Sequence, residues 1–329
     1  MHSRRDLLAS VAAFGAAAAL PRLANAAAPA PTGEAAKMYA FFDKAMAETF
    51  RRNPEVPTYL GIDKGALAWT KSELSDFSLT AMAENKANNT RQLKTLHSLD
   101  RKQLSGMDAV NYDTVDFTLS VAEEGNRFPY GSGGAGAPYV LSQLTGAYQQ
   151  MPDFLDNQHT IETKSDADAY MARLESFGRL LDQEVEAVRH DVALGVIPPD
   201  FVIDKTLTQL NAFLASAPAD APVVKSLVRR TAEKKIDGDW ANQAAGLYAE
   251  KVRPALARQA ELLKELRPKA VHDAGCWRLP DGEAYYATSL KQYTTSTITP
   301  DEVHKTGLEL VKSLSAQADV LMKKAGYIK

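Results

Sequence analysis

Apolar residues recur at spacings of three and four along most of the chain, and this periodicity most restricts what the chain can fold into. The clearest stripe runs along residues 165–194 and consists of Tyr170, Leu174, Phe177, Leu181, Val185, Val188 and Val192. Other stripes lie in residues 38–50, 79–96, 110–121, 239–266 and 303–321. No alternation of strands and helices is found, and no repeat of roughly 20 to 50 residues. We therefore predict a mostly α protein, a multi-helix array with long amphipathic helices and little or no β-structure.

Several helix ends are also predicted. Ser165 followed by Asp168 predicts the start of the longest helix, and Pro254 predicts a kink in the helix over residues 239–266. Thr299, with Glu302 three residues later, has the pattern of a capping box at the start of the last helix. The stripes of the longest and the last helix are one-sided. Each therefore needs a partner surface to bury it.

The N-terminus has the pattern of an export signal over residues 1–26. Arg4 and Arg5 precede an apolar run of 14 residues, shorter than the roughly 20 needed to span a bilayer, and Ala24 and Ala26 fit a cleavage site. The twin arginines favour the twin-arginine export route. The alternative is a Sec signal that carries two arginines. Either route predicts a periplasmic or secreted protein.

The mature chain is predicted to contain a linker over residues 27–34 and a helical domain over residues 35–329. No cysteine lies near the cleavage site, so we expect no membrane anchor after signal cleavage. Lys and Arg number 38 against 41 Asp and Glu, which gives a net charge of −3. So even a balance gives no electrostatic reason to expect a nucleic-acid partner.

Motifs that carry chemistry are absent from the sequence. None of the six histidines has a second histidine three to five residues away, so the zinc-binding H-E-x-x-H pattern does not occur. The single cysteine, Cys276, has no partner for a disulfide. Residues 131–136 fit G-x-G-x-x-G, but we interpret them as a loop between helices. We therefore predict no catalytic residue, metal ligand or cofactor site within this chain.

One aromatic and hydroxyl-rich patch is a candidate for substrate binding. It comprises Tyr285, Tyr286, Tyr293, Thr294 and Thr295, which could line a cleft and bind a peptide backbone. The alternative is that a tyrosine face packs in the core while the threonines form a linker.

Five stretches, in this order and spacing, resemble a bacterial family known as domain of unknown function 885. They are PYVLSQLTGA at 138–147, DADAYMARL at 166–174, GVIPP at 195–199, PDGEAYY at 280–286 and TPDEVHKTGL at 299–308. The resemblance covers nearly all of the mature chain.

The resemblance implies a largely helical, exported protein of about twice this length. Family members carry an H-E-x-x-P-G-H type sequence in their second half, which makes them similar to zinc metallopeptidases of the gluzincin kind. This chain ends at Lys329, before any such segment. We therefore expect it to be the N-terminal half, inactive alone, of a protein that binds zinc and peptide substrates when intact. The alternative is a non-catalytic periplasmic helical protein that binds a peptide or a partner.

Overall fold

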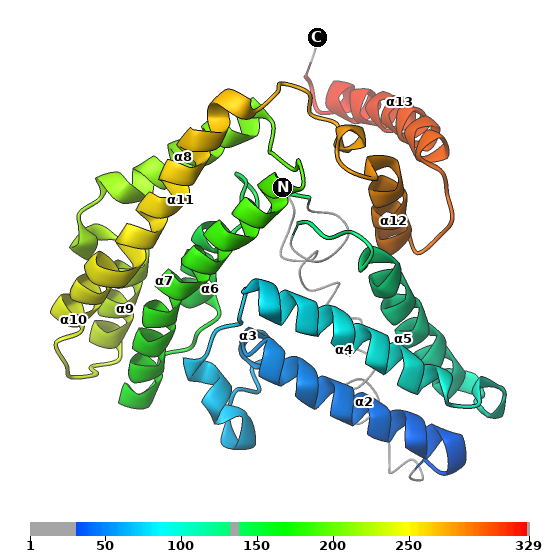
Figure 1. Ribbon diagram of the computed structural model, residues 1–329, viewed down its shortest axis with the longest axis horizontal. Coiled ribbons are helices and arrows are strands. Elements are labelled where there is room, and N and C mark those ends of the chain that lie inside the picture. Colours follow the sequence, from blue (N-terminus) through cyan, green and yellow to red (C-terminus); the bar gives the residue numbers. More distant parts are fainter. Residues whose placement is uncertain (1–30, 132–137, 328–329) are drawn as a thin grey trace.

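The computed structural model describes residues 31–131 and 138–327, and these form helices without any strand (Figure 1). The prediction of a mostly α, multi-helix array is therefore confirmed for the described part of the chain. Within the same ranges, no helix combines the length and apolar character that crossing a bilayer requires. The helices are α2 (Gly33–Arg52), α3 (Glu55–Tyr59), α4 (Leu79–His97), α5 (Gly106–Gly125), α6 (Ala147–Asn157), α7 (Lys164–Ala193), α8 (Asp200–Ala215), α9 (Pro222–Glu233), α10 (Trp240–Leu247), α11 (Arg253–Leu266), α12 (Gly282–Thr294) and α13 (Pro300–Lys324).

The predictions for the N-terminus fall mostly outside the described residues. Arg4, Arg5, Ala24 and Ala26 of the export signal lie there, as does most of the predicted linker. The first described helix, α2, begins at Gly33. Helical structure therefore starts two residues before the predicted domain boundary.

A long central helix, α7, organises the larger part of the fold. It packs against α6, α9 and α11, and α11 also packs against α8 (Figure 1). At ~1.5 Å per residue, its 30 residues span roughly 45 Å. Tyr170, Leu174, Phe177 and Leu181 of its apolar stripe are each at most 2% exposed. Other helices of this chain bury the stripe, so α7 has its predicted partner surface within the described residues.

A second group of helices packs beside this body. α2, α4 and α5 enclose a core that includes Met38, Phe42, Leu96 and Leu119, and α12 packs against α5. In Figure 1 the three helices form the lower right of the molecule, apart from the body around α7. The stripes over residues 38–50, 79–96 and 110–121 thus mark α2, α4 and α5, as the periodicity predicts.

The start of α7 differs from the sequence prediction. Its N-cap is Thr163, whose hydroxyl accepts a hydrogen bond from the amide of Asp166, while the Asp166 carboxylate accepts one from the amide of Thr163. Asp166 also pairs with Lys71 at 2.5 Å, a contact between distant parts of the chain. The predicted cap of Ser165 with Asp168 is therefore wrong by two residues. The tertiary ion pair holds Asp166 where the sequence rules favoured Asp168.

The helix over residues 239–266 is interrupted near Pro254, as predicted. One π-helical turn, Tyr248–Val252, separates α10 from α11, and the amide of Arg253 bonds the carbonyl of Tyr248. Proline lacks the amide hydrogen that a regular helix needs, which explains a break at this point. The turn packs on α7 at Gly178, where a Cβ would lie 2.7 Å from the carbonyl oxygen of Lys251. Only glycine allows the two backbones to approach so closely.

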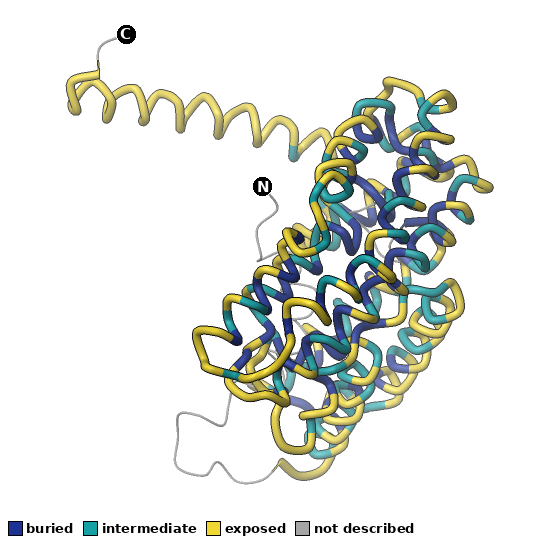
Figure 2. The backbone as a smooth tube through the Cα atoms, turned by 90° about the vertical axis from the view of Figure 1, so that its left-hand side faces the viewer, coloured by how far each residue is buried: buried dark blue, intermediate teal, exposed yellow. Residues whose placement is uncertain are grey.

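The last helix, α13, stands away from the rest of the protein. Thr299 and Glu302 form the predicted capping box at its start, with Pro300 in the first turn. None of its residues is buried, and Figure 2 shows the helix extending from the body as a continuous exposed segment. The described residues provide no partner surface for the apolar stripe of α13, where Leu310, Leu314 and Leu321 are 54%, 58% and 65% exposed.

Candidate functional site

The predicted aromatic and hydroxyl patch divides into two environments on α12. Tyr285 is 3% exposed and packs between Phe128 and Tyr130, at ring-centroid distances of 5.2 and 5.5 Å. Tyr286 and Tyr293 are 45% and 60% exposed. The structure therefore places Tyr285 in the core, so it does not line a cleft together with its neighbours.

The two threonines lie at the exposed end of α12. The Thr294 hydroxyl donates to the carbonyl of Leu290, and Thr295 is the C-cap with a φ of +52°. Residues of this helix line neither of the two cavities between α6, α7 and α9 that are described below. Substrate binding by the four exposed residues stays a prediction.

The histidines are dispersed, and each of those inside the body has its own local partner. His97 lies 2.6 Å from Asp116, His272 lies 2.9 Å from Asp200, and the His190 ring contacts its neighbour Asp191. Across residues 31–131 and 138–327, no three His, Cys, Asp or Glu side chains are placed to hold a metal ion. The donor set of the described chain therefore does not fit the zinc ion that the family resemblance implies.

The most deeply buried charge is Arg173, on α7. Its guanidinium is fully enclosed and donates to the carbonyls of Glu73 and Thr70 at 3.0 Å and to the Thr58 hydroxyl at 2.9 Å. It also contacts Nδ1 of His159 at 2.9 Å. Burial lowers the pKa of Arg173 to about 10, so the side chain stays charged at neutral pH. This network joins the segment between α2 and α4 to the central helix, which is a structural role.

His159 belongs to the same network and is fully buried. Burial, and next the charge of Arg173, lower its pKa to about 3. Its Nδ1 accepts from Arg173, which leaves Nε2 to donate to the carbonyl of Asp166 at 2.9 Å. The imidazole is therefore neutral at physiological pH and is committed to two structural hydrogen bonds.

A second buried acid, Glu184, lies inside the body around α7. Its carboxylate accepts from the amide of Ala147, the first residue of α6, at 2.7 Å, and from Nε2 of Gln259 at 2.9 Å. No cation contacts it, and burial raises its pKa to about 8. The amide bond at a helix start satisfies one backbone donor that the helix itself cannot pair. Glu184 thus anchors the start of α6.

Between the two groups of helices, Asp191 and Lys86 are both partly removed from water. The Asp191 carboxylate accepts from the amide of Gly131 at 2.8 Å, and burial raises its pKa. The Lys86 ammonium donates to the carbonyls of Asn126 and Phe128, and burial lowers its pKa. Perturbed pKa values of this kind are typical of functional sites, but they also occur in structural ion networks. Through these contacts Lys86 pairs carbonyl groups at and just after the end of α5, so it stabilises the end of that helix.

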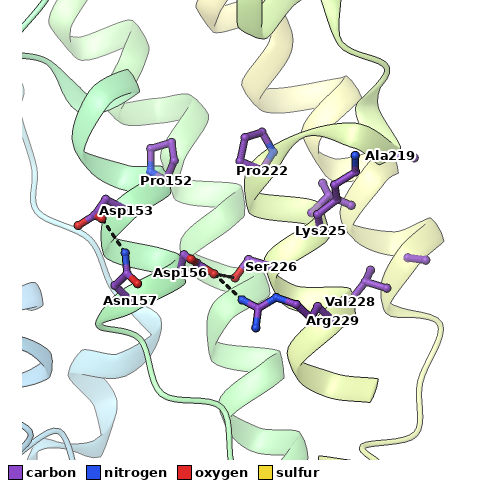
Figure 3. A pocket seen from close by; sticks show the side chains of 12 residues that line it. Pro152, Asp153, Asp156, Asn157, Ala219, Pro222, Lys225, Ser226, Val228 and Arg229 are labelled. Atoms are coloured by element: carbon purple, nitrogen blue, oxygen red, sulfur yellow. Dashed lines mark hydrogen bonds and ion pairs between the residues drawn. The ribbon is translucent and has the colours of Figure 1, made fainter. Parts of the chain in front are cut away.

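The candidate functional site is a cleft of about 680 Å³ between α6 and α9. One wall is α6, which contributes Asp153, Asp156 and Asn157 (Figure 3). The opposite wall is α9, which contributes Lys225 and Arg229. Acidic and basic side chains therefore face the same space from different helices. The volume lies in the range of about 300–1,000 Å³ that is usual for small-ligand sites.

The walls meet at one hydrogen-bonded contact. The Asp156 carboxylate accepts from the Ser226 hydroxyl at 2.6 Å and pairs with Arg229 at 2.9 Å. Both charged side chains stay about half exposed, at 41% and 54%. An ion pair this exposed contributes only ~0–1 kcal/mol, so either partner can exchange it for a ligand group at small cost.

The rest of the lining is apolar and includes Pro152 inside α6, Pro222 at the start of α9, Val224 and Val228. None of these residues belongs to a chemical motif in the sequence, because the cleft depends on which two helices lie side by side. The only local signal for this cleft in the sequence is the pair of prolines, because a proline has no backbone N–H and so can leave a helix carbonyl unpaired.

Comparison with known proteins supplies a family and a fold. The family model described as "Bacterial protein of unknown function (DUF885)" matches residues 54–329. The crystal structure described as that of "the putative lipoprotein from Colwellia psychrerythraea" is similar to this chain, with a TM-score of 0.77 and 20% sequence identity. That similarity covers 90% of this chain and 52% of the other, so this chain spans about half the length of the solved one. No curated protein matches the chain.

Proposed function

Because the chain belongs to the DUF885 family of bacterial proteins, we propose that it is the helical N-terminal part of an exported, zinc-dependent peptidase. In this proposal, the zinc ligands and the residues that activate water come from a further part of the protein. The helices of this chain wall the substrate cleft and restrict which peptides enter it.

The single observation that carries the proposal is the exposed apolar face of α13. A regular, well-capped helix of 25 residues with Leu310, Leu314 and Leu321 open to solvent is typical of an interaction surface. The length of the solved relative supports a further part of the protein as the occupant, because that relative's chain is about twice the length that this chain covers.

The experiment compares this chain alone with the same chain produced together with the coding sequence that follows Lys329 in its gene. A mixed peptide library, read by mass spectrometry with and without a metal chelator, measures hydrolysis, and metal analysis measures zinc. We expect no hydrolysis and no stoichiometric zinc for the chain alone. We expect chelator-sensitive hydrolysis and one zinc per molecule for the longer protein.

A matched pair of variants tests whether α13 makes the connection. Leu314→Glu places a charge on the apolar stripe, whereas Lys312→Glu changes a charge outside it. The first variant should lose hydrolysis in the longer protein, and the second should keep it. Hydrolysis by the isolated chain, or a gene that ends at Lys329 with no neighbouring partner, would contradict the proposal.

A second candidate function is a periplasmic helical protein that binds a peptide or partner without catalysis. The observation that favours it is the α6–α9 cleft, which is formed entirely by described residues of this chain. Peptide binding by the chain alone, with no peptidase activity in any longer form, would favour this candidate.

A further inference from the structure

We propose that the α6–α9 cleft is a binding site for short peptides that have free ends and an apolar side chain. The inference rests on the proposed function only for the choice of peptides as the ligand class. It assigns the ligand ammonium to the acidic wall of α6, the ligand carboxylate to the basic wall of α9, and the apolar side chain to the floor between them.

Charge complementarity is the first reason for this assignment. Asp153 and Asp156 lie on one wall, and Lys225 and Arg229 lie on the other, so the lining of the cleft is bipolar (Figure 3). Lys225 pairs with Asp220 at 2.8 Å, and both side chains are exposed, so a ligand carboxylate can replace Asp220 at small cost. A ligand with a single charge matches only half of such a site. A zwitterion matches both halves, and the planar guanidinium of Arg229 can hold a carboxylate through two parallel hydrogen bonds.

The floor of the cleft is the second reason. Pro152 and Pro222 line the cleft and also a small internal cavity of about 10 Å³ directly beneath, with room for about one water molecule. Val224 and Val228 complete the apolar lining. A floor without hydrogen-bonding side chains takes an aliphatic or aromatic side chain and disfavours a charged one.

A third, independent observation is the hydroxyl of Tyr248. Tyr248 lines the small cavity beneath the floor, is 2% exposed, and its hydroxyl has no hydrogen-bond partner in the described chain. Buried polar groups in proteins are nearly always paired, so an unpaired hydroxyl indicates a missing partner. In this proposal the partner is one water molecule in the small cavity, which a carbonyl of a peptide seated on the floor bonds in turn.

The test is isothermal titration calorimetry of the intact chain with leucyl-phenylalanine and with its N-acetylated, C-amidated form. We expect saturable binding of the free dipeptide and binding at least about tenfold weaker for the blocked form, because a charge-assisted hydrogen bond contributes about that factor. Equal affinity for the two forms, or no binding of either, would overturn the proposal.

Variants locate the site. Arg229→Met should weaken binding of the free dipeptide about tenfold. Arg258→Met is the matched control, because Arg258 makes a similarly exposed ion pair with Asp182 away from the cleft and should leave the affinity unchanged. Tyr248→Phe should keep the melting temperature and weaken binding several-fold. If the two arginine variants behave alike, the ligand binds elsewhere and the assignment is wrong.

The experiments distinguish a wrong assignment of the α6–α9 cleft from a wrong proposal of peptidase function. Calorimetry on this chain measures binding without any hydrolysis, whereas the peptidase experiment measures cleavage by the longer protein. If this chain does not bind the dipeptide but the longer protein cleaves peptides, only the assignment of the α6–α9 cleft is wrong. If this chain binds the dipeptide but no longer form cleaves peptides, only the proposed peptidase function is wrong.

Discussion

Replacing Arg173 by methionine should strongly destabilise the fold. The guanidinium makes four contacts of 3.0 Å or less, two of them to the carbonyls of Glu73 and Thr70. Methionine keeps much of the apolar stem but removes all four contacts, and only the Thr70 carbonyl keeps a second donor, the amide of Glu73 at 3.2 Å. Each hydrogen bond from a charged donor contributes roughly 1.5–3 kcal/mol, and relief of the buried charge offsets part of that sum. We expect a net loss of about 3–5 kcal/mol.

Urea unfolding followed by circular dichroism measures this loss. Arg179→Met is the control, because Arg179 lies on the same helix, is exposed, and has hydrogen bonds of 3.3–3.4 Å only. The control should change the free energy of unfolding by less than about 1 kcal/mol. If Arg173→Met does not fold, Arg173→Lys should fold with an intermediate loss. A loss below about 1 kcal/mol for Arg173→Met would show that the buried hydrogen bonds of Arg173 do not stabilise the fold to the expected extent.

The loss of stability in Arg173→Met should depend on pH, because His159 belongs to the same hydrogen-bond network as Arg173. The pKa of His159 is about 3 in the folded state and ~6.5 in an unfolded chain. The unfolded state therefore binds a proton that the folded state does not, and stability falls as the pH drops from ~6.5 to ~3, by up to ~1.4 kcal/mol per pH unit. Arg173→Met removes one cause of the lowered pKa, so its stability should depend less steeply on pH in this range.

Three further predictions follow from the structure and the sequence. Gly178→Ala should cost about 1–2 kcal/mol in urea unfolding, because its Cβ meets a backbone carbonyl, whereas Gly246→Ala, with open space around its Cβ, should stabilise by about 0.5–1 kcal/mol. Glu184→Gln should be more stable than the wild type at about pH 9 and similar at about pH 4, because the folded-state pKa of about 8 makes the wild type lose stability as the pH rises from ~4.5 to ~8. Arg4→Lys with Arg5→Lys should abolish periplasmic accumulation in cell fractionation, and undiminished accumulation would exclude the twin-arginine route.

Much of the helical architecture is predictable from the sequence, because each helix carries its own periodic signal. The stripe over residues 165–194 identifies α7 within one residue at each end, and the Thr299–Glu302 pattern identifies the start of α13. Pro254 identifies the interruption before α11, although not its π-helical form. These features depend on residues a few positions apart, which is the range that local rules describe.

The arrangement of the helices and the candidate cleft could not be predicted, because both depend on contacts between distant segments. The cap of α7 is formed by Thr163 and Asp166, two residues before the predicted one, because Asp166 pairs with Lys71, which is 95 positions away. Glu184 has no local sequence signal that distinguishes it from a surface acid, yet it is buried against the start of α6. Tyr285 was grouped with exposed neighbours, yet the aromatic cluster around Phe128 draws it into the core.

We propose that this chain is one helical part of a longer protein, joined to the rest through the apolar face of α13. Hydrogen–deuterium exchange of the α13 amides, compared between this chain alone and the longer protein, measures whether that face is covered. We expect rapid exchange along residues 300–324 in the chain alone and exchange slower by at least about tenfold in the longer protein. Equally rapid exchange of α13 in both proteins would show that α13 does not join this chain to another part.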